Sequence, residues 1–237
     1  MKKLICVLVL FLIGIFPVWA DTISTDKSGF DKIYNVIDDA VFDLRYYSSY
    51  NFTGHKIRGY KAPIAYMTEE ALQALAVAAA DLRAQGYRIL VWDSYRPQKA
   101  VDHFVRWAKD PADVRMKQYF YPELEKKDII PRHYIAEHSG HSRGGTVDLT
   151  LFDMASQQDL DMGGTFDYFG EISHPGYRGI TEEQYRNRML LQQLMVKRGF
   201  RPLDSEWWHF TLENEVYPDT YFTFPVRSAS LKSAAAG

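Results

Sequence analysis

The chain has 237 residues, of which 46% are hydrophobic and 15% aromatic, enough for one domain with a substantial core. A formal net charge of −2 excludes nucleic-acid binding through a basic face and membrane attachment through a polybasic patch. The one cysteine, Cys6, lies close to the N-terminus. The domain that follows therefore contains no disulfide and must rely on its core or on a bound metal.

The first predicted element is a secretory signal peptide at residues 1–20. Lys2 and Lys3 make its start positive, an apolar stretch follows from 4 to 16, and Val18-Trp19-Ala20 resembles a small-x-small cleavage site. The apolar stretch is shorter than the roughly 20 residues that span a membrane. We therefore expect no stable membrane insertion after removal of the signal, with a retained N-terminal anchor as the alternative. The expected location is outside the cytoplasm, in the periplasm.

Two helices and a strand are predicted in the first half of the domain. Residues 68–85 carry acids in the first turn and are followed by Gly86, a pattern typical of a helix. Residues 87–92 form a largely apolar run that predicts a buried strand. After a turn at 93–97, a second helix is predicted over 98–109.

In the second half, residues 146–152 alternate between apolar and polar side chains, which predicts a strand. One face of this strand would carry Val147, Leu149 and Leu151, and the other Thr146, Asp148 and Thr150. Residues 181–198 begin with a capping box and end at Gly199, as a long helix does. A closing strand is predicted at 207–212.

Helices and strands are both present but do not alternate regularly. We therefore predict an α+β fold, with a small central antiparallel sheet and flanking helices, rather than a doubly wound α/β sheet. The domain is expected to span residues 21–227. The segment 228–237 is small and polar, which predicts a disordered tail.

A first group of polar residues lies in the segment Ser139 to Asp148. A catalytic zinc site needs imidazole and carboxylate ligands from different backbone directions, with one position open for water. Here His141 stands in a glycine-rich turn before a strand that presents Asp148. Gly144 and Gly145 allow a tight reversal that brings His141 back over Asp148. The alternative is a polar turn with an ordinary surface histidine.

A second group is Glu206-Trp207-Trp208-His209, which offers a base and a ligand three residues apart. In a regular strand, positions three apart face opposite sides. Glu206 must therefore lie in the turn before the strand, or a bulge must redirect it. Asp204 and Ser205 just upstream favour the turn. The alternative is a strand edge whose tryptophans belong to the core. Together, the two groups supply three ligands and a free carboxylate, the composition of a catalytic rather than a closed structural zinc site.

The pattern S-x-H-x-x-G-x-x-x-D followed by E-x-x-H resembles the D-alanyl-D-alanine dipeptidases, the family of the vancomycin-resistance dipeptidase. That family shares a zinc-binding fold with D,D-carboxypeptidases and with the hedgehog signalling domain. The resemblance runs from about Val41 to the Trp-Trp-His-Phe segment. Supporting segments are Val41–Tyr46, Asn51–Gly54, Asp93–Pro97 and Asp161–Asp167. Thr146 departs from the alanine usual in the family.

The resemblance implies one zinc ion per chain, held by His141, Asp148 and His209. Glu206 would take the proton of the attacking water, and Arg96 would stabilise the oxyanion that forms as water adds to the peptide carbonyl. His138, three residues before His141, is the rival metal ligand and is expected to lie outside the ligand set.

Asp167 and Ser139 match the positions that hold the free ammonium of the substrate, with Asp161 and Asp153 as nearby competitors. Asp93 is expected to orient Arg96 or its loop.

The implied activity is hydrolysis of the small dipeptide D-Ala-D-Ala, linked to turnover of cell-wall peptides or nutrient recovery rather than to resistance. Two alternatives remain open. One is a peptidoglycan D,D-carboxypeptidase or endopeptidase, which would need a cleft open to a longer chain. The other is a zinc-stabilised binding module without activity, which would need neither Glu206 nor Arg96.

Overall fold

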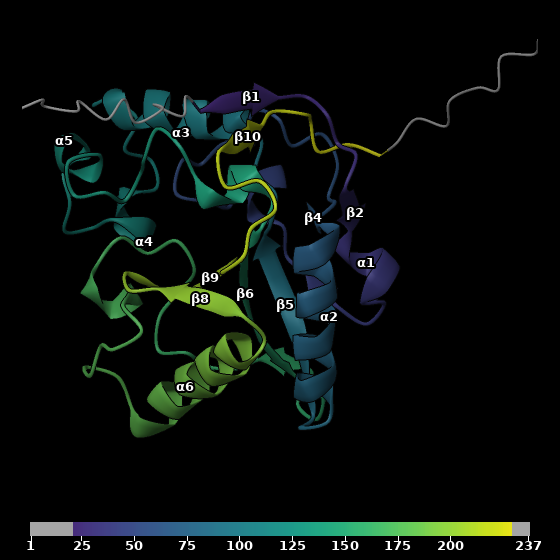
Figure 1. Ribbon diagram of the computed structural model, residues 1–237. Helices are drawn as coiled ribbons and strands as arrows, with labels where there is room; N and C mark the ends of the chain where they lie inside the picture. The colour runs from purple at the N-terminus through teal and green to yellow at the C-terminus, as the bar shows by residue number, and fades with distance from the viewer. Residues whose placement is uncertain (1–20, 229–237) are drawn as a thin grey trace, which may run out of the picture.

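A six-stranded sheet organises the computed structural model, which describes residues 21–228 (Figure 1). The strand order is β3 (Val41–Phe42), β5 (Tyr87–Asp93), β6 (Thr146–Asp153), β9 (Glu206–Leu212) and β8 (Phe200–Leu203), with β7 (Gln158–Asp159) paired to β6. All pairs are antiparallel except β3 with β5. The helix between these two strands returns the chain to the same edge, as a parallel pair requires. The predicted α+β class is confirmed, and β3 is the one strand that departs from an antiparallel sheet.

Two long helices, α2 (Glu69–Arg83) and α6 (Glu182–Lys197), flank the sheet and contact each other. In α2 the buried positions recur every three or four residues: Ala71, Leu72, Leu75, Ala78, Ala79 and Leu82. The carboxylate of Asp81 on α2 accepts hydrogen bonds from Arg198, just past the end of α6, at 2.6 and 2.9 Å. The predicted capping box of α6 is present, with Thr181 as its N-cap.

A third helix, α3, covers Gln98–Lys109 as predicted. The remaining elements are short. The strand β1 (Thr22–Ser24) pairs in parallel with β10 (Thr220–Phe222), and β2 (Phe30–Lys32) pairs with β4 (Tyr66–Thr68). Single helical turns complete the fold: α1 (Ile33–Val36), η1 (Arg45–Tyr47), α4 (Lys117–Phe120), α5 (Lys126–Ile129), η2 (Gly140–Arg143) and η3 (Glu171–Ser173).

Two irregularities in strand pairing shape the polar face of the sheet. Val91 pairs with Leu149 and Asp93 with Asp148, so Trp92 is an extra residue in β5. Between β8 and β9 the register shifts after Pro202. Bulges of this kind redirect side chains near functional sites. The alternation predicted for β6 is confirmed: Val147, Leu149 and Leu151 are fully buried on one face, and Asp148 lies on the other beside its partners from β5 and β9.

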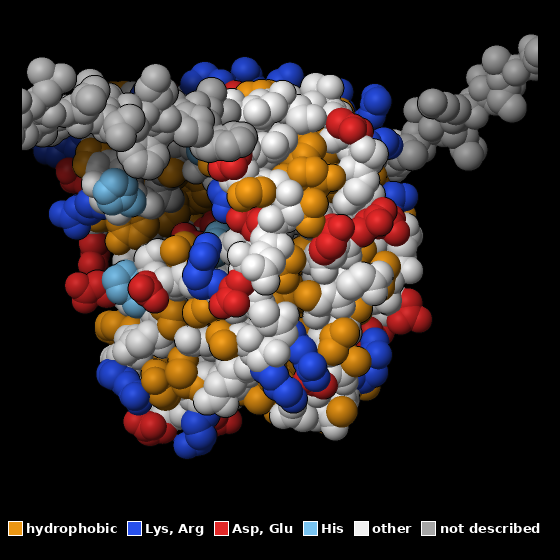
Figure 2. All heavy atoms as spheres, viewed as in Figure 1, with side chains coloured by type: hydrophobic (Ala, Val, Ile, Leu, Met, Phe, Trp, Pro, Cys, Tyr) orange, Lys and Arg blue, Asp and Glu red, His pale blue; other side chains and the backbone are white. Residues whose placement is uncertain are grey.

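The predicted signal peptide and all of the predicted tail except Ser228 lie outside the described residues. Within residues 21–228, no helix has the length and apolar character needed to cross a membrane. On the face shown in Figure 2, acidic and basic side chains are interspersed with hydrophobic ones.

Candidate metal and catalytic site

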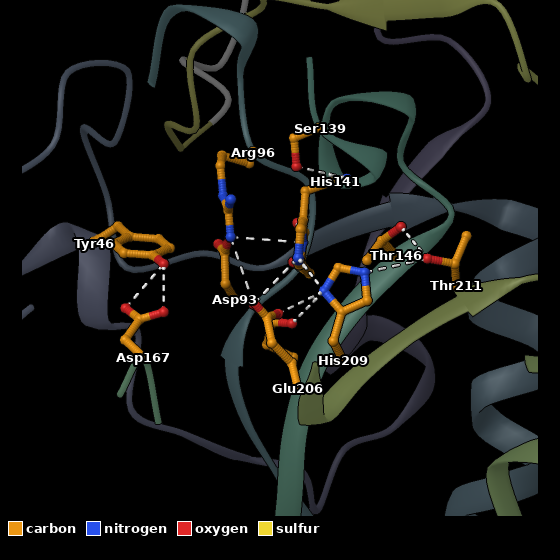
Figure 3. Close-up of polar contacts among 12 residues, drawn as sticks. Tyr46, Asp93, Arg96, Ser139, His141, Thr146, Asp167, Glu206, His209 and Thr211 are labelled. Atoms are coloured by element: carbon orange, nitrogen blue, oxygen red, sulfur yellow. Dashed lines mark hydrogen bonds and ion pairs between the residues drawn. The ribbon is translucent and has the colours of Figure 1, made fainter. Parts of the chain in front are cut away.

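Three side chains from three elements converge at the centre of the polar face (Figure 3). Nε2 of His141 on η2 lies 3.2 Å from Oδ2 of Asp148 on β6. Nδ1 of His209 on β9 lies 3.1 Å from Oδ1 of Asp148 and 3.3 Å from Nε2 of His141. His141 and Asp148 are each only 1% exposed. The fold therefore brings together the three residues that the sequence pattern predicts as metal ligands.

The turn before β6 explains how His141 reaches Asp148. Ser139 caps η2, its Oγ accepting a hydrogen bond from the His141 backbone N–H at 3.3 Å. Gly144 ends η2 in the left-handed region, with a φ of 85°, and a Cβ there would overlap the ring of Phe30. Gly145 serves differently, since a Cβ on it would approach Oε1 of Glu215 to 2.8 Å. One glycine thus provides the reversal and the other the close packing.

Strand register brings the other two ligands together. Asp148 and His209 are directly opposite each other in the β6–β9 pair, so their side chains share one face of the sheet. Asp93 is opposite Asp148 on the other side, in β5. Asp93, Asp148 and His209 thus lie side by side on the polar face, one on each of three neighbouring strands.

Glu206 shares this face because the pairing of β9 is irregular. Pro202 pairs with Phe210, yet the next residue of β8, Leu203, pairs with Glu206, so three residues of β9 are unmatched. The irregularity turns the Glu206 carboxylate toward His209, with Oε2 3.4 Å from Nδ1. Glu206 therefore lies at the start of β9 beside a bulge, and not in the turn that Asp204 and Ser205 favour.

Buried charges in this cluster depend on one another. Burial by itself raises the pKa of Asp148, but ion pairing with His141 and His209 outweighs it and holds that pKa below its ordinary value. Burial by itself lowers the pKa of His209, whereas its contacts with Asp148 and Glu206 raise that pKa to about 9. Asp148 and His209 therefore each favour the charged form of the other.

The donor set suits a zinc ion. It combines two imidazole nitrogens with one carboxylate oxygen, as in catalytic zinc sites with three protein ligands. Oδ1 of Asp148 is buried and makes no hydrogen bond within residues 21–228. Nδ1 of His141 donates to the carbonyl of Ser94 at 2.7 Å, which leaves Nε2 as the ligating atom. The residues present therefore fit a zinc ion at this point.

Arg96 approaches the cluster from the turn after β5. Its Nε donates to Oδ2 of Asp93 at 2.9 Å, and its Nη2 lies 3.5 Å from Oδ2 of Asp148. Asp93 in turn accepts a hydrogen bond from the Tyr60 hydroxyl at 2.7 Å. Asp93 therefore orients Arg96, as expected, and leaves part of the guanidinium directed at Asp148.

Asp167 lies at the other side of the same cavity. The hydroxyl of Tyr46 lies 3.0 Å from each of its carboxylate oxygens. Burial, and then the charge of Asp148, raise the pKa of Asp167 well above its ordinary value. Its backbone is left-handed, with a φ of 62°. A buried carboxylate of this kind favours a cationic partner, which the cavity leaves room to accept.

A cavity of about 180 Å³ connects these groups, and its lining includes Arg96, Ser139, Asp167, Glu206 and the three ligands. Ser139 and Asp167 share the cavity without a hydrogen bond between them within the described chain. The two residues predicted to hold the ammonium therefore both line the cavity, and Ser139 is also engaged by the backbone of His141.

The competing residues take other roles. Asp161 accepts hydrogen bonds from the Gly163 N–H and Gln184, and Asp153 from the turn at Ala155 and Ser156. His138 lines the cavity but lies outside the ligand cluster, with its Nε2 3.7 Å from Asp21. None of the three coincides with the predicted ligand or ammonium position.

Sequence reasoning missed Tyr46, Tyr60 and Thr211, which contact the site residues. No local pattern joins Tyr46 to Asp167, since 121 residues separate them. Thr211 could have been found, because it follows His209 by two residues and so shares its face of the strand.

An α+β fold with two histidines, an aspartate, a free glutamate and an arginine around a small cavity defines a metallopeptidase-like site. A family model described as D-Ala-D-Ala dipeptidase matches residues 26–227. The chain is 39% identical to a D-alanyl-D-alanine dipeptidase of Enterococcus faecalis, covering 84% of this chain and 99% of that protein. It is 40% identical to one of Streptomyces coelicolor, covering 80% and 96%. The chain belongs to the D-Ala-D-Ala dipeptidase family and is an enzyme of the metallopeptidase class.

Among solved structures, a zinc-bound mutant of the vancomycin-resistance D,D-pentapeptidase VanY aligns with 67% of this chain and 78% of its own. The sequence identity is 15% and the TM-score 0.38. That likeness is too distant to bear on the site.

Proposed function

We propose that this enzyme hydrolyses free D-Ala-D-Ala to D-alanine, using one zinc ion. The observation that carries the proposal is the convergence of His141, Asp148, His209 and Glu206 on a cavity walled by the buried carboxylate of Asp167. The cavity has a volume of about 180 Å³, and Asp167 on its wall would pair with a free N-terminus, which suits a dipeptide better than a long peptide. The family membership of the chain supports the same substrate.

A zinc ion held by His141, Asp148 and His209 would polarise the scissile carbonyl and bring the pKa of a water near 7. Glu206 accepts the proton of the attacking water and passes it to the leaving amine. The guanidinium of Arg96, steadied by Asp93, donates to the developing oxyanion. Asp167, steadied by Tyr46, pairs with the substrate ammonium and so selects a free N-terminus.

The deciding experiment compares free D-Ala-D-Ala, its N-acetylated form and a cell-wall pentapeptide as substrates of the zinc-loaded enzyme. We expect cleavage of the free dipeptide alone. In Glu206→Gln, we expect kcat to fall by about 10²–10⁴ with zinc content unchanged. Glu213→Gln, an exposed glutamate just beyond β9, is the matched control. If the enzyme cleaves the pentapeptide, it is instead a cell-wall carboxypeptidase. If it cleaves none of the three substrates, it is a binding module.

For the cellular role, we propose an exported enzyme of the periplasm that recovers or turns over wall-derived dipeptides. The support is the sequence pattern of residues 1–20. Cell fractionation with N-terminal sequencing tests it. A mature N-terminus at Asp21 in the periplasmic fraction is expected, and a cytosolic protein that retains Met1 would contradict it.

A further inference from the structure

His209 meets the metal position through Nδ1, and its other ring nitrogen faces away from the cavity. Nε2 lies 3.4 Å from Oγ1 of Thr211, two residues further along β9. Oγ1 of Thr211 lies 2.9 Å from Oγ1 of Thr146 on the neighbouring strand β6. Figure 3 shows the contact from the imidazole to the Thr211 hydroxyl and the next contact from there to the Thr146 hydroxyl. A hydrogen-bonded chain thus runs from the ligand ring into the sheet.

Strand register fixes this chain. Thr146 is directly opposite Thr211 in the β6–β9 pair, as Asp148 is opposite His209. Both threonines are buried, at 0% and 6% exposure. The backbone of Gly140 packs closely against this pair of hydroxyls, since a Cβ on Gly140 would lie 2.8 Å from the Thr146 hydroxyl. The two hydroxyls therefore have few other partners and little freedom to turn.

The direction of the hydrogen bonds follows from the site. When Nδ1 of His209 offers its lone pair to a metal, the proton of the ring must reside on Nε2. Nε2–H then donates to Thr211, which leaves the Thr211 proton to donate to Thr146. A ligating histidine usually donates its outer N–H to a carboxylate, carbonyl or water. In this protein a buried hydroxyl pair has that position.

We propose that Thr211, supported by Thr146, positions His209 for metal binding by holding its ring in the Nε2–H tautomer. This inference rests on the proposed metal site and adds two positioning residues to it. Neither threonine touches the substrate cavity, because neither belongs to its lining. Their effect is therefore expected on metal affinity and ligand geometry rather than on substrate binding.

The test measures zinc affinity by competition with a chromogenic chelator, and the visible absorption of the cobalt(II)-substituted protein. We expect Thr211→Val to weaken zinc binding by about 10–100-fold and to alter the cobalt spectrum. Thr211→Ser, which keeps the hydroxyl, should retain both, and Thr146→Val should give a smaller loss than Thr211→Val. The melting temperature of the metal-free protein shows whether each variant folds.

Thr150→Val is the matched control. Thr150 lies on the same strand and face as Thr146 and is 1% exposed, but its hydroxyl has no partner within residues 21–228. Its zinc affinity and cobalt spectrum should equal those of the wild type. If Thr211→Val binds zinc as tightly as Thr150→Val, the positioning role is wrong while the metal site stands. If the wild type binds no zinc, the proposed function and this inference both fail.

Discussion

His141 and His209 present different ring nitrogens to the same carboxylate. Nε2 of His141 lies 3.2 Å from Oδ2 of Asp148, whereas Nδ1 of His209 lies 3.1 Å from Oδ1. The outer nitrogens are occupied accordingly, by the carbonyl of Ser94 and the hydroxyl of Thr211. As ligands of the proposed metal, the two histidines would require opposite tautomers, and the protein has a separate partner for each.

This asymmetry predicts which amide substitutions keep some metal binding. The terminal group of asparagine reaches about as far as Nδ1 of histidine, and that of glutamine about as far as Nε2. We therefore expect His209→Asn to bind zinc more tightly than His209→Gln, and His141→Gln more tightly than His141→Asn. Chelator competition measures all four variants. The same ranking at both positions would show that the ring nitrogens are not used differently.

Asp167→Asn should relax the preference for a free N-terminus. Losing a charge-assisted contact of about 1.5–3 kcal/mol should raise KM for free D-Ala-D-Ala by roughly 10–150-fold. Asparagine tolerates the left-handed backbone at this position, so the fold should be kept. Asp161→Asn is the control, because Asp161 is bonded to Gly163 and Gln184 instead. Equal KM values in both variants would remove Asp167 from substrate binding.

Arg96→Lys should not preserve activity. Arg96 is 13% exposed at its side chain and uses Nε for Asp93 while Nη2 extends toward Asp148. A single ammonium cannot do both, so kcat should fall by about 10²–10³ with a smaller change in KM. Arg115→Lys is the control, because it makes the same change at an exposed arginine that is paired with Asp113. A loss confined to KM would argue against a role at the oxyanion.

The buried Lys126 should make the free energy of unfolding depend on pH, independently of the active site. Its ammonium is buried over the ring of Trp107 and donates to the Trp107 carbonyl at 2.6 Å. Burial lowers its pKa from 10.5 to about 8. Between these values the unfolded chain binds more protons, so this lysine makes the free energy of unfolding rise as pH increases through that window.

Urea unfolding of the wild type and of Lys126→Met, measured from about pH 8 to about pH 10.5, isolates the contribution of this lysine to the free energy of unfolding. The wild type should gain stability relative to the variant as pH rises from about 8 to about 10.5, and the difference should level off above it. Other titrating groups cancel in the comparison. A difference that stays constant with pH would mean that folding does not lower the pKa of Lys126.

Local patterns predicted the main elements closely. The helix predicted at 98–109 is α3, and the strand predicted at 146–152 ends one residue later as β6. These predictions rest on patterns that extend over only a few residues, namely acidic first turns, a capping box, and the alternation of apolar and polar side chains. Such patterns can be recognised in the sequence itself. The convergence of Asp148 and His209 could be predicted because the surrounding motif is specific.

Long-range contacts could not be predicted in this way. The hydrogen bonds from Tyr46 to Asp167 and from Tyr60 to Asp93 join segments 121 and 33 residues apart. The extra residue Trp92 arises only where β5 meets β6, and the parallel pairing of β3 only once α2 has folded back. These features depend on pairing register, which no single segment specifies.

The left-handed backbone at Asp167 restricts how the specificity of this enzyme could diverge. Glycine, asparagine and aspartate adopt a φ near 62° readily, whereas most other residues lose about 1–2 kcal/mol there. An apolar side chain at this wall would add that strain to the loss of the carboxylate. Substitution at position 167 should therefore be least costly for a few small residues, and new substrates should be more accessible through changes elsewhere in the lining.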